Sequence, residues 1–397
     1  MKILTLNCGS SSIKYKLLDM NLNTTLAQGG IEKIGMPDSF LKFTLSSDEK
    51  VVLEKQVQQH QTGIEFILEV ICSKEYGCIH SLSEIDAVGH RVVHGGEKFN
   101  SSVIINDEVI DKIKECIDLA PLHNPANLSG IEAVNKLMPE IPQIAVFDTA
   151  FHQTMPDYAF RYALPYSLYE KYMIRRYGFH GTSHRYVSER ACEFLGLPYE
   201  KQRIITCHIG NGASIAAICN GKVQDTSMGM TPMEGLMMGT RSGDVDAGVL
   251  AYVMEKEQME VADLLNLINK DSGVLGVSGV SSDMREIHAA IDAGNEKAIL
   301  ALKMYNYRIK KYIGSYIAAL GGVDVLVFTG GVGENQIGIR EQACCNLEFL
   351  GISLDAAANR VRGEEAIIST PDSKVKVVVI PTDEEYMIAL ETVNILK

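Results

Sequence analysis

The stretch MKILTLNCGSSSIKYKLL at 1–18 has alternating apolar residues on both sides of a run of Gly and Ser. The alternation predicts a β-strand before the run and another after it, and the Gly and Ser residues predict a turn between them. Asn7, Ser10 and Ser12 bring hydrogen-bonding side chains to this turn, and Gly9 allows a close approach of the backbone. Such a turn can line a phosphate or a hydrated metal ion, although an ordinary hairpin turn has the same composition.

A weak internal repeat supports a structural role for this stretch. The segment ILTLNCGSSSI at 3–13 is echoed by IITCHIGNGASI at 204–215, where His208 takes the place of Asn7 and the second copy is one residue longer. Two such hairpins about 200 residues apart suggest two related domains facing each other. We place the boundary near residue 150, after the apolar run IAVF.

The rest of the chain alternates β-rich apolar runs with amphipathic helical stretches, which predicts an α/β architecture. The clearest helix is expected near 296–320, because its apolar residues recur every three or four positions. That apolar face comprises Leu302, Tyr305, Ile309, Ile313, Tyr316 and Leu320. Gly321 and Gly322 are expected to end the helix, and VDVLVF then predicts a buried strand.

Composition excludes several classes of protein. The 397 residues are 46% apolar and 22% charged with a net charge of −13, so nonspecific binding to nucleic acid is not expected. No apolar run approaches the length of a membrane span and no signal peptide is evident. The nine cysteines are dispersed without metal-binding spacing, which fits reduced thiols in the cytoplasm.

Two arginines lie where they can bind a small anion. Arg91 lies in GHRVVHGGEKF at 89–99, and Arg241 is flanked by Gly and Ser in GTRSGDVD at 239–246. A guanidinium can form two parallel hydrogen bonds to a carboxylate or phosphate. The alternatives are a surface arginine beside a turn for Arg91, and an ion pair with Asp244 or Asp246 for Arg241.

Carboxylates follow two apolar strands. Asp148 comes directly after QIAVF, and the acidic run PTDEE at 381–385 comes after VKVVVI. Because α/β proteins bind ligands at the carboxyl ends of strands, these side chains can hold Mg²⁺ directly or through water. The alternatives are a helix N-cap for Asp148 and the start of a last helix, at 385–397, for the acidic run.

Two further segments belong with this group. RRYGFHGTSHRYV at 175–187 places His180 before an expected helix whose N-cap would be Thr182 or Ser183. VLVFTGGVGENQ at 325–336 predicts a Gly-rich turn after a buried strand, which can cradle phosphate although it is not a Walker A motif. Glycine turns, arginines and carboxylates together suit phosphoryl transfer, where catalysis is mostly positioning and neutralisation of charge.

These motifs resemble, in order and over nearly the whole chain, those of the acetokinase family, within the actin, Hsp70 and sugar kinase superfamily. The matching motifs are NCGSSSIKY, GHRVVHGGEKF, APLHNP, VFDTAFHQTMP, YGFHGTSH, CHIGNGAS, GTRSGDVD, SGVLGVSG, FTGGVGEN and PTDEE. One departure is Asp383, where the family commonly has Asn, and the additional carboxylate can alter metal preference.

The resemblance implies an α/β fold of two actin-like (ribonuclease H-like) domains facing each other across a nucleotide cleft. Residues 1–150 would form the N-terminal domain, with the helix at 385–397 packed back on it, and residues 151–384 the C-terminal domain with the nucleotide site and a dimer interface. The implied activity is reversible transfer of a phosphoryl group from ATP to acetate, giving acetyl phosphate and ADP by direct in-line attack. Mg²⁺ would be required, with Mn²⁺ able to replace it, in a cytoplasmic homodimer.

The resemblance also implies residue roles. Asn7 and Glu384 would hold the metal, Arg91 and Arg241 would bind the carboxylate and phosphoryl groups, and His180 would stabilise the transferring phosphoryl group. The nucleotide site would comprise Ser10, Ser12, Lys14, His208, Ile209, Gly210, Asn211, Gly212, Asp283, Met284, Arg285, Gly331, Val332, Gly333, Glu334 and Asn335. The acid would be bound by Arg91 and enclosed by Val93, Leu122, Phe179 and Pro232.

Asp148 would be catalytic as well, and elementary chemistry restricts its role. A short carboxylic acid is already ionised at neutral pH, so the attacking carboxylate has no proton to lose. We therefore expect Asp148 to orient Mg²⁺, its waters or the substrate, in contrast to its assignment as a base in this family.

Two other functions compete with acetate phosphorylation. A kinase for propionate or butyrate would differ in the pocket walls that set chain length. Because one methylene group is worth about 1–3 kcal/mol of discrimination, propionate should also be accepted to some extent. A non-enzymatic scaffold related to actin or to the Hsp70 ATPase domain would have no need for arginines that bind small anions.

Overall fold

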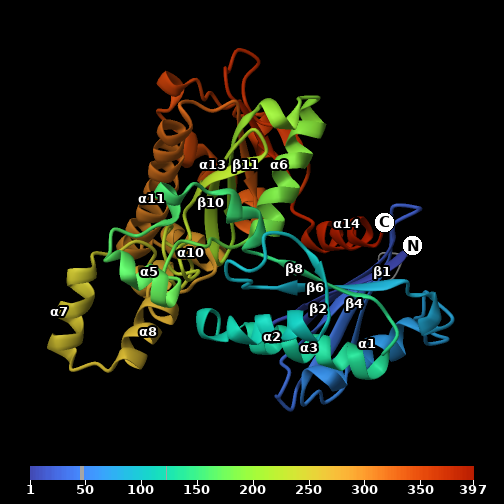
Figure 1. Cartoon of the computed structure of the whole chain (residues 1–397). Helices are drawn as coiled ribbons and strands as arrows, with labels where there is room; N and C mark the ends of the chain where they lie inside the picture. The colour runs from blue at the N-terminus through green and yellow to red at the C-terminus, as the bar shows by residue number, and fades with distance from the viewer. Residues whose placement is uncertain (45–48, 122) are drawn as a thin grey trace. The chain divides into compact units, whose positions relative to one another are not determined.

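The computed structural model describes residues 1–44, 49–121 and 123–397, and the chain divides into two compact units. The first comprises Met1–Phe151 and Asp383–Lys397, and the second comprises His152–Thr382. Each unit is built on its own sheet with helices packed against it, so the predicted α/β class is confirmed (Figure 1).

The first unit contains a mixed sheet with the strand order β5-β4-β3-β2-β1-β6-β8-β7. Its strands are β1 (Lys2–Cys8), β2 (Ile13–Asp19), β3 (Thr24–Glu32), β4 (Phe40–Thr44), β5 (Lys50–Glu54), β6 (Ala87–Val92), β7 (Val103–Ile104) and β8 (Gln143–Phe147). β1, β6 and β8 run parallel, whereas β1 to β5 form an antiparallel meander.

Helices cover both faces of this sheet. α1 (His60–Ile71) and α3 (Asn124–Leu137) pack on one face, α2 (Asp107–Glu115) packs beside α3, and α14 (Glu384–Leu396) packs on the other face (Figure 1). The alternation along β1 explains this arrangement: Leu4 and Leu6 join the core under α1 and α3, while Ile3 joins Ile388 and Val393 of α14.

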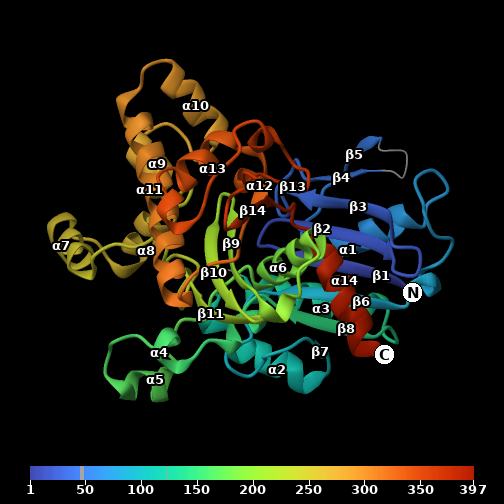
Figure 2. The same ribbon diagram turned by 90° about the horizontal axis from the view of Figure 1, so that it is seen from above.

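The second unit contains a mixed sheet with the order β11-β10-β9-β12-β14-β13. Its strands are β9 (Arg203–Ile209), β10 (Ala213–Cys219), β11 (Lys222–Thr226), β12 (Val325–Thr329), β13 (Ala366–Ile367) and β14 (Lys376–Val379). Its helices are α4 (Asp157–Phe160), α5 (Tyr166–Tyr172), α6 (Gly181–Leu195), α7 (Ala247–Glu257), α8 (Val261–Lys270), α9 (Gly273–Ser278), α10 (Met284–Asp292), α11 (Glu296–Leu320), α12 (Gly330–Asn335) and α13 (Ile337–Cys344). Helix α6 packs against β9 and β12, and α11 packs against β9 and β10 (Figures 1 and 2).

The expected long helix is confirmed as α11, which ends at Leu320 with Gly321 in the left-handed conformation. Tyr305, Ile309, Ile313 and Tyr316 of the predicted face are buried. Leu302 and Leu320 are only half-buried, because the buried stripe shifts to Ala301 and Ile317. The strand predicted after the helix is also confirmed, as β12.

The internal repeat is confirmed as two strand–turn–strand units, β1–β2 and β9–β10. The register pairs Cys8 with Ile13 and Ile209 with Ala213, so the first turn has four residues and the second has three. The additional residue suggested by the sequence comparison therefore lies outside the second turn.

Among the described residues, none of the helices combines the length and the apolarity that crossing a bilayer requires.

Candidate active site

In the first unit, Asn7, Arg91 and Asp148 meet at the carboxyl ends of three neighbouring strands. Arg91 Nε lies 3.0 Å from Asp148 Oδ1 and Nη2 lies 2.5 Å from Oδ2, while Nη1 donates to Asn7 Oδ1 over 3.1 Å. The register explains the meeting, because β8 ends at Phe147 opposite Val92, which places Asp148 directly beside Arg91. Neither alternative is correct: Arg91 is not a mere surface residue and Asp148 is not engaged as a helix cap.

Burial governs the electrostatics of this cluster. Asp148 is 1% exposed. Burial lowers the pKa of Arg91, but the charge and hydrogen bonds of Asp148, together with the charges of Glu384 and Glu385, outweigh this effect and raise the pKa. Burial also raises the pKa of Glu384 to about 7, an effect opposed by Arg91 and reinforced by the charges of Asp148 and Glu385. A bound cation would stabilise the charged form of Glu384.

The residues of this cluster fit a hydrated Mg²⁺. The ion prefers oxygen ligands, takes one or two carboxylates and keeps several waters. Asn7, Asp148 and Glu384 provide an amide oxygen and two carboxylates of this kind. Among the described residues, no group of three or more His, Cys, Asp or Glu side chains has the geometry of a metal site, so water or substrate oxygens would complete the ion's coordination.

The carboxylates of the acidic run at 381–385 have different roles, since Asp383 stabilises the fold and Glu384 is the candidate metal ligand. Asp383 accepts a hydrogen bond from Tyr386 N as the N-cap of α14 and pairs with Lys16 over 2.6 Å. Both Glu384 and Glu385 lie in the first turn of α14. The acidic run therefore begins the last helix and also contains the candidate metal ligand Glu384. The carboxylate of Asp383 is already bound by Lys16.

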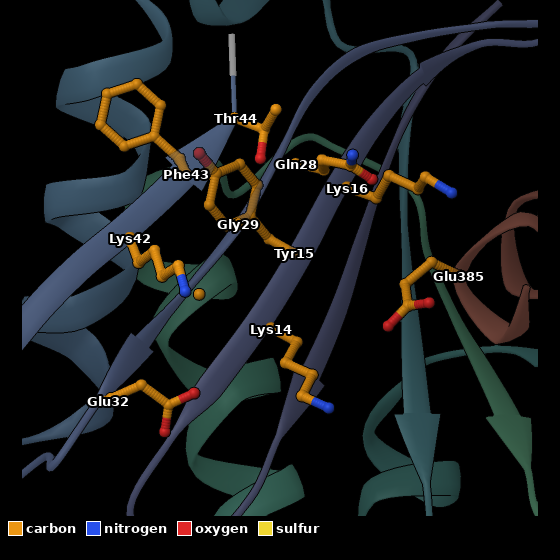
Figure 3. A pocket seen from close by; sticks show the side chains of 11 residues that line it. Lys14, Tyr15, Lys16, Gln28, Gly29, Glu32, Lys42, Phe43, Thr44 and Glu385 are labelled. Carbon is orange, nitrogen blue, oxygen red and sulfur yellow. The ribbon is translucent and has the colours of Figure 1, made fainter. Parts of the chain in front are cut away.

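The polar face of the meander carries a pocket of about 310 Å³ that includes Lys14 (Figure 3). Lys14 pairs with Asn7 across β1 and β2 and with Gly30 across β2 and β3, so it lies next to the candidate metal ligand. Figure 3 shows Glu385 of α14 and the ammonium group of Lys42 around the same hollow.

Hydrogen bonds to its backbone hold the turn before Lys14 in place. His60 Nε2 lies 2.6 Å from Gly9 O, Asn127 donates to Cys8 O over 2.8 Å, and Gly9 N donates to Ser12 O. Ser10 is exposed and Ser12 is half-buried within this turn. A fixed turn with exposed hydroxyl groups is suited to hold an anionic group.

In the second unit, Arg241 and His180 converge above Gly212. A Cβ atom built on Gly212 would lie 3.4 Å from Arg241 Nη1 and 3.8 Å from His180 Nε2, so the absence of a side chain leaves this space open. Arg241 Nη1 donates to Pro232 O over 3.0 Å, and burial lowers the pKa of Arg241. Within the described residues no carboxylate forms an ion pair with it, so the alternative of a pair with Asp244 or Asp246 is wrong.

His180 belongs to a cluster of imidazoles and hydroxyl groups. Its ring stacks on His208 with centroids 4.3 Å apart, and its Nδ1 lies 2.9 Å from Ser214 Oγ. The same Oγ lies 2.7 Å from Nε2 of His184, whose pKa is held well below the usual value by burial. Ser183 Oγ lies 2.7 Å from His208 Nδ1. Because Ser214 has a single proton to donate, it couples the tautomer of His180 to that of His184.

The backbone at His180 is unusual. Helix α6 begins at Gly181 with His180 as its N-cap residue, so the predicted caps Thr182 and Ser183 are wrong. His180 has φ 56° and ψ 25°, a left-handed conformation that is uncommon for a residue other than glycine. Such strain tends to persist at functional sites, where the surrounding structure fixes it.

A pocket of about 480 Å³ brings together most of the predicted nucleotide residues of the second unit. Its predicted members are Gly210, Asn211, Asp283, Met284, Arg285, Gly331, Val332 and Asn335, and Gly239, Ser282 and Gln336 join them. Asp283 caps α10, and its pKa is lowered to about 2 by the exposed Arg285.

The predicted Gly-rich turn after β12 is instead the helix α12. Gly330 has φ 77°, and a Cβ there would lie 2.8 Å from Ile209 O. Glu334 turns inward, where its Oε1 accepts from Gly330 N and Thr382 N over 2.8 and 3.1 Å. Ile209, Gly333 and Glu334 therefore support the pocket and do not line it.

The predicted walls of the acid pocket are distributed over both units. Val93 is buried in the first unit, and Phe179 is buried in the second, where its carbonyl lies 2.9 Å from His152 Nε2. Pro232 is half-buried in the second unit. Leu122 lies outside the described residues.

Sequence reasoning missed several residues of these sites. Ser214 contacts the candidate catalytic His180, Ser183 contacts His208, and Gly239, Ser282 and Gln336 line the candidate nucleotide pocket. Ser183 and Ser214 lie within the motifs YGFHGTSH and CHIGNGAS. Their role could be suspected from those motifs, but their partners follow only from the packing of α6 beside the paired strands β9 and β10.

Comparison with known proteins extends these observations. The chain is 69% identical over 396 residues to the acetate kinase of Azobacteroides pseudotrichonymphae and 67% identical over 398 residues to that of Bacteroides thetaiotaomicron, with full coverage of both proteins in each case. The crystal structure of Porphyromonas gingivalis acetate kinase matches with a TM-score of 0.96 at 66% identity, covering all of both chains. A propionate kinase from Francisella tularensis matches with a TM-score of 0.91 at 43% identity, covering 98% of each chain.

The model of the acetokinase family matches residues 2–390. Because this match spans nearly the whole chain and curated relatives share about two thirds of its residues over their full length, the chain belongs to the acetokinase family.

Proposed function

We propose that this chain catalyses the reversible, Mg²⁺-dependent transfer of the γ-phosphoryl group of ATP to acetate, giving acetyl phosphate and ADP by direct in-line attack. As a member of the acetokinase family it is a phosphotransferase with a carboxyl group as acceptor. The observation that carries the mechanism is the convergence of Arg241 and His180 above Gly212, because it offers an unpaired cation and an imidazole to one small anion.

Arg241 and His180 would act on the transferring phosphoryl group. The transition state of phosphoryl transfer spreads negative charge over three oxygens, and fixed donors aimed at this charge lower the barrier. Arg241 would provide guanidinium N–H groups that no carboxylate of the described residues neutralises. His180 would donate from Nε2 while Ser214 holds its Nδ1.

The cluster of the first unit would hold the metal and one end of the acid. Mg²⁺, when bound, neutralises charge on the phosphate oxygens. Asn7 and Glu384 would hold it, and Asp148 would orient its waters. Arg91 holds Asp148 in place through two hydrogen bonds, and its remaining N–H groups would bind the carboxylate of the acid.

The nucleotide would be bound by the pocket beside α10 and α12. Asn211, Asp283 and Arg285 offer polar groups there, and Gly331 leaves room for close approach because a Cβ at this position would meet nothing within 4 Å. Lys14, Ser10 and Ser12 would contribute to the binding of phosphate from the first unit.

We further infer that the two units are two domains and that the protein is a cytoplasmic homodimer. Large apolar side chains remain exposed on α7, α8 and α11 of the second unit, as expected for an interface. They include Val249, Tyr252, Val261, Leu265, Leu300, Met304 and Tyr307. Free cysteines support a reducing compartment.

The competing functions are not favoured. The acetate kinases of Azobacteroides pseudotrichonymphae and Bacteroides thetaiotaomicron are 69% and 67% identical to this chain, whereas the propionate kinase is 43% identical. A hydroxylamine-trapping assay for acyl phosphate, with ATP, Mg²⁺ and a panel of acetate, propionate and butyrate, tests the proposal. We expect the highest kcat/KM with acetate. A higher kcat/KM with a longer acid, or hydrolysis of ATP without any acyl phosphate, would overturn it.

A further inference from the structure

Arg241 lies in a long segment without helix or strand, residues 227–246, which connects β11 to α7. The same segment contains Pro232, whose carbonyl accepts from Arg241 Nη1 over 3.0 Å. The direction of the guanidinium therefore depends on the position of Pro232. An irregular segment holds one conformation only where other contacts fix it.

Arg176 fixes the beginning of this segment. Its Nη1 donates to the carbonyl oxygens of Thr226, Ser227 and Met228 over 2.8, 3.0 and 3.2 Å. Its Nη2 lies 2.5 Å from Oε1 of Glu234. One guanidinium thus joins the end of β11 to a residue six positions beyond Met228.

Tyr162 fixes the same segment through the other oxygen of the Glu234 carboxylate. Its hydroxyl group donates to Glu234 Oε2 and accepts from Met230 N over 3.0 Å. A Cβ on Gly229 would lie 1.8 Å from Glu234 Oε2 and 2.3 Å from Tyr162 Oη, so only glycine allows this closure. Met230 and Glu234 are therefore held by one hydroxyl group, and the three residues between them, with Pro232 in the centre, form a closed loop.

We propose that Glu234, held between Tyr162 and Arg176, is a positioning residue that sets Pro232 and Arg241 and thereby determines the affinity and chain-length selectivity for the acid. This inference rests on the proposed function, in which Arg241 binds the reacting anions and Pro232 is a pocket wall. Charge-assisted hydrogen bonds are short and directional, so they suit this task better than apolar packing.

Two variants test the proposal, Glu234→Gln and Tyr162→Phe. Each should raise KM for acetate by about 10-fold and lower the ratio of kcat/KM for acetate to that for propionate by about 3-fold, while KM for ATP changes by less than about 2-fold. Tyr162→Phe removes a single hydroxyl group, so it carries the test if Glu234→Gln folds poorly.

Glu365→Gln is the matched control. Glu365 pairs with Arg190 in the same unit over 2.6 and 2.9 Å, and its side chain is 28% exposed against 26% for Glu234. We expect Glu365→Gln to lower the melting temperature without changing either kinetic ratio. If Glu234→Gln and Tyr162→Phe behave like this control, the proposal is wrong and the closed loop serves stability alone. If the parent protein forms no acyl phosphate, the proposed function fails first and the inference fails with it.

Discussion

Arg91 and Asp148 form a two-pronged ion pair, with Nε 3.0 Å from Oδ1 and Nη2 2.5 Å from Oδ2. Arg241, the other arginine expected to bind anions, has no such partner within the described residues. The two arginines therefore differ in what their removal leaves behind. Removal of Arg91 leaves the buried carboxylate of Asp148 without its partner, whereas removal of Arg241 eliminates a desolvated cation and breaks no ion pair among the described residues.

Arg91→Leu should reduce both stability and activity. An unpaired Asp148 that is 1% exposed should cost about 3 kcal/mol of unfolding free energy, since one partner of a buried pair is lost. Urea unfolding and the acyl phosphate assay measure the two effects. An unchanged free energy of unfolding would mean that water solvates Asp148 in the absence of Arg91.

Arg241→Leu should reduce activity without reducing stability. We expect kcat/KM for acetate to fall by at least about 100-fold, because charge-assisted hydrogen bonds to the reacting anions are lost. The melting temperature should not fall, since burial disfavours the charge of Arg241 and no ion pair is broken. Near-parental kcat/KM in the folded variant would exclude Arg241 from the reaction.

Asp148→Asn distinguishes a metal orienter from a base. The change preserves shape and one oxygen but removes the charge, so we expect a large loss of kcat that excess Mg²⁺ or Mn²⁺ relieves in part. Initial rates over a series of metal concentrations provide the measurement. A loss that is independent of metal, together with a lost acidic limb of the pH–rate profile, would instead identify Asp148 as a proton acceptor.

Glu384→Ala should raise the Mg²⁺ concentration needed for half-maximal rate more than Glu385→Ala does. Glu384 is near Arg91 and Asp148, and a hard cation loses an oxygen ligand or the anchor of its water when this carboxylate is removed. Both residues lie in the first turn of α14, so the neighbouring variant controls for effects on the helix. The reverse order in a metal titration would move the ligand to Glu385.

His90 predicts a loss of stability in acid. It is 2% exposed, burial lowers its pKa to about 4, and its Nε2 lies 2.8 Å from Gln143 Oε1. The unfolded chain, with a pKa near 6.5, binds the proton first, so stability is complete above this pH and decreases as the pH falls toward 4. At pH 5 the protonation of His90 in the unfolded chain has removed about 2 kcal/mol of the unfolding free energy present above pH 6.5.

The matching variant is His90→Gln, which retains an N–H donor without a titrating group. Urea unfolding at pH 7.5 and pH 5 should show a smaller decrease for the variant than for the parent protein. Equal decreases for the variant and the parent protein would show that His90 does not cause the loss of stability in acid, and would point to other groups, among them the buried His184.

The amino-acid sequence by itself determined the local elements and the family. Alternating apolar residues around NCGSSS and HIGNG specify two strand–turn–strand units, and the period of three and four specifies α11, because both patterns reflect local backbone geometry. The ordered motifs also identified most residues that line the candidate nucleotide pocket, since each motif is a continuous stretch of chain.

Only the tertiary structure decided how those residues are paired. Arg91 and Asp148 are 57 positions apart and meet because β6 and β8 pair in one particular register. Glu234 and Tyr162 are 72 positions apart and meet through the packing of two irregular segments. Periodicity and composition describe neighbours along the chain, whereas the partner of a buried charge is set by the register and packing of distant elements.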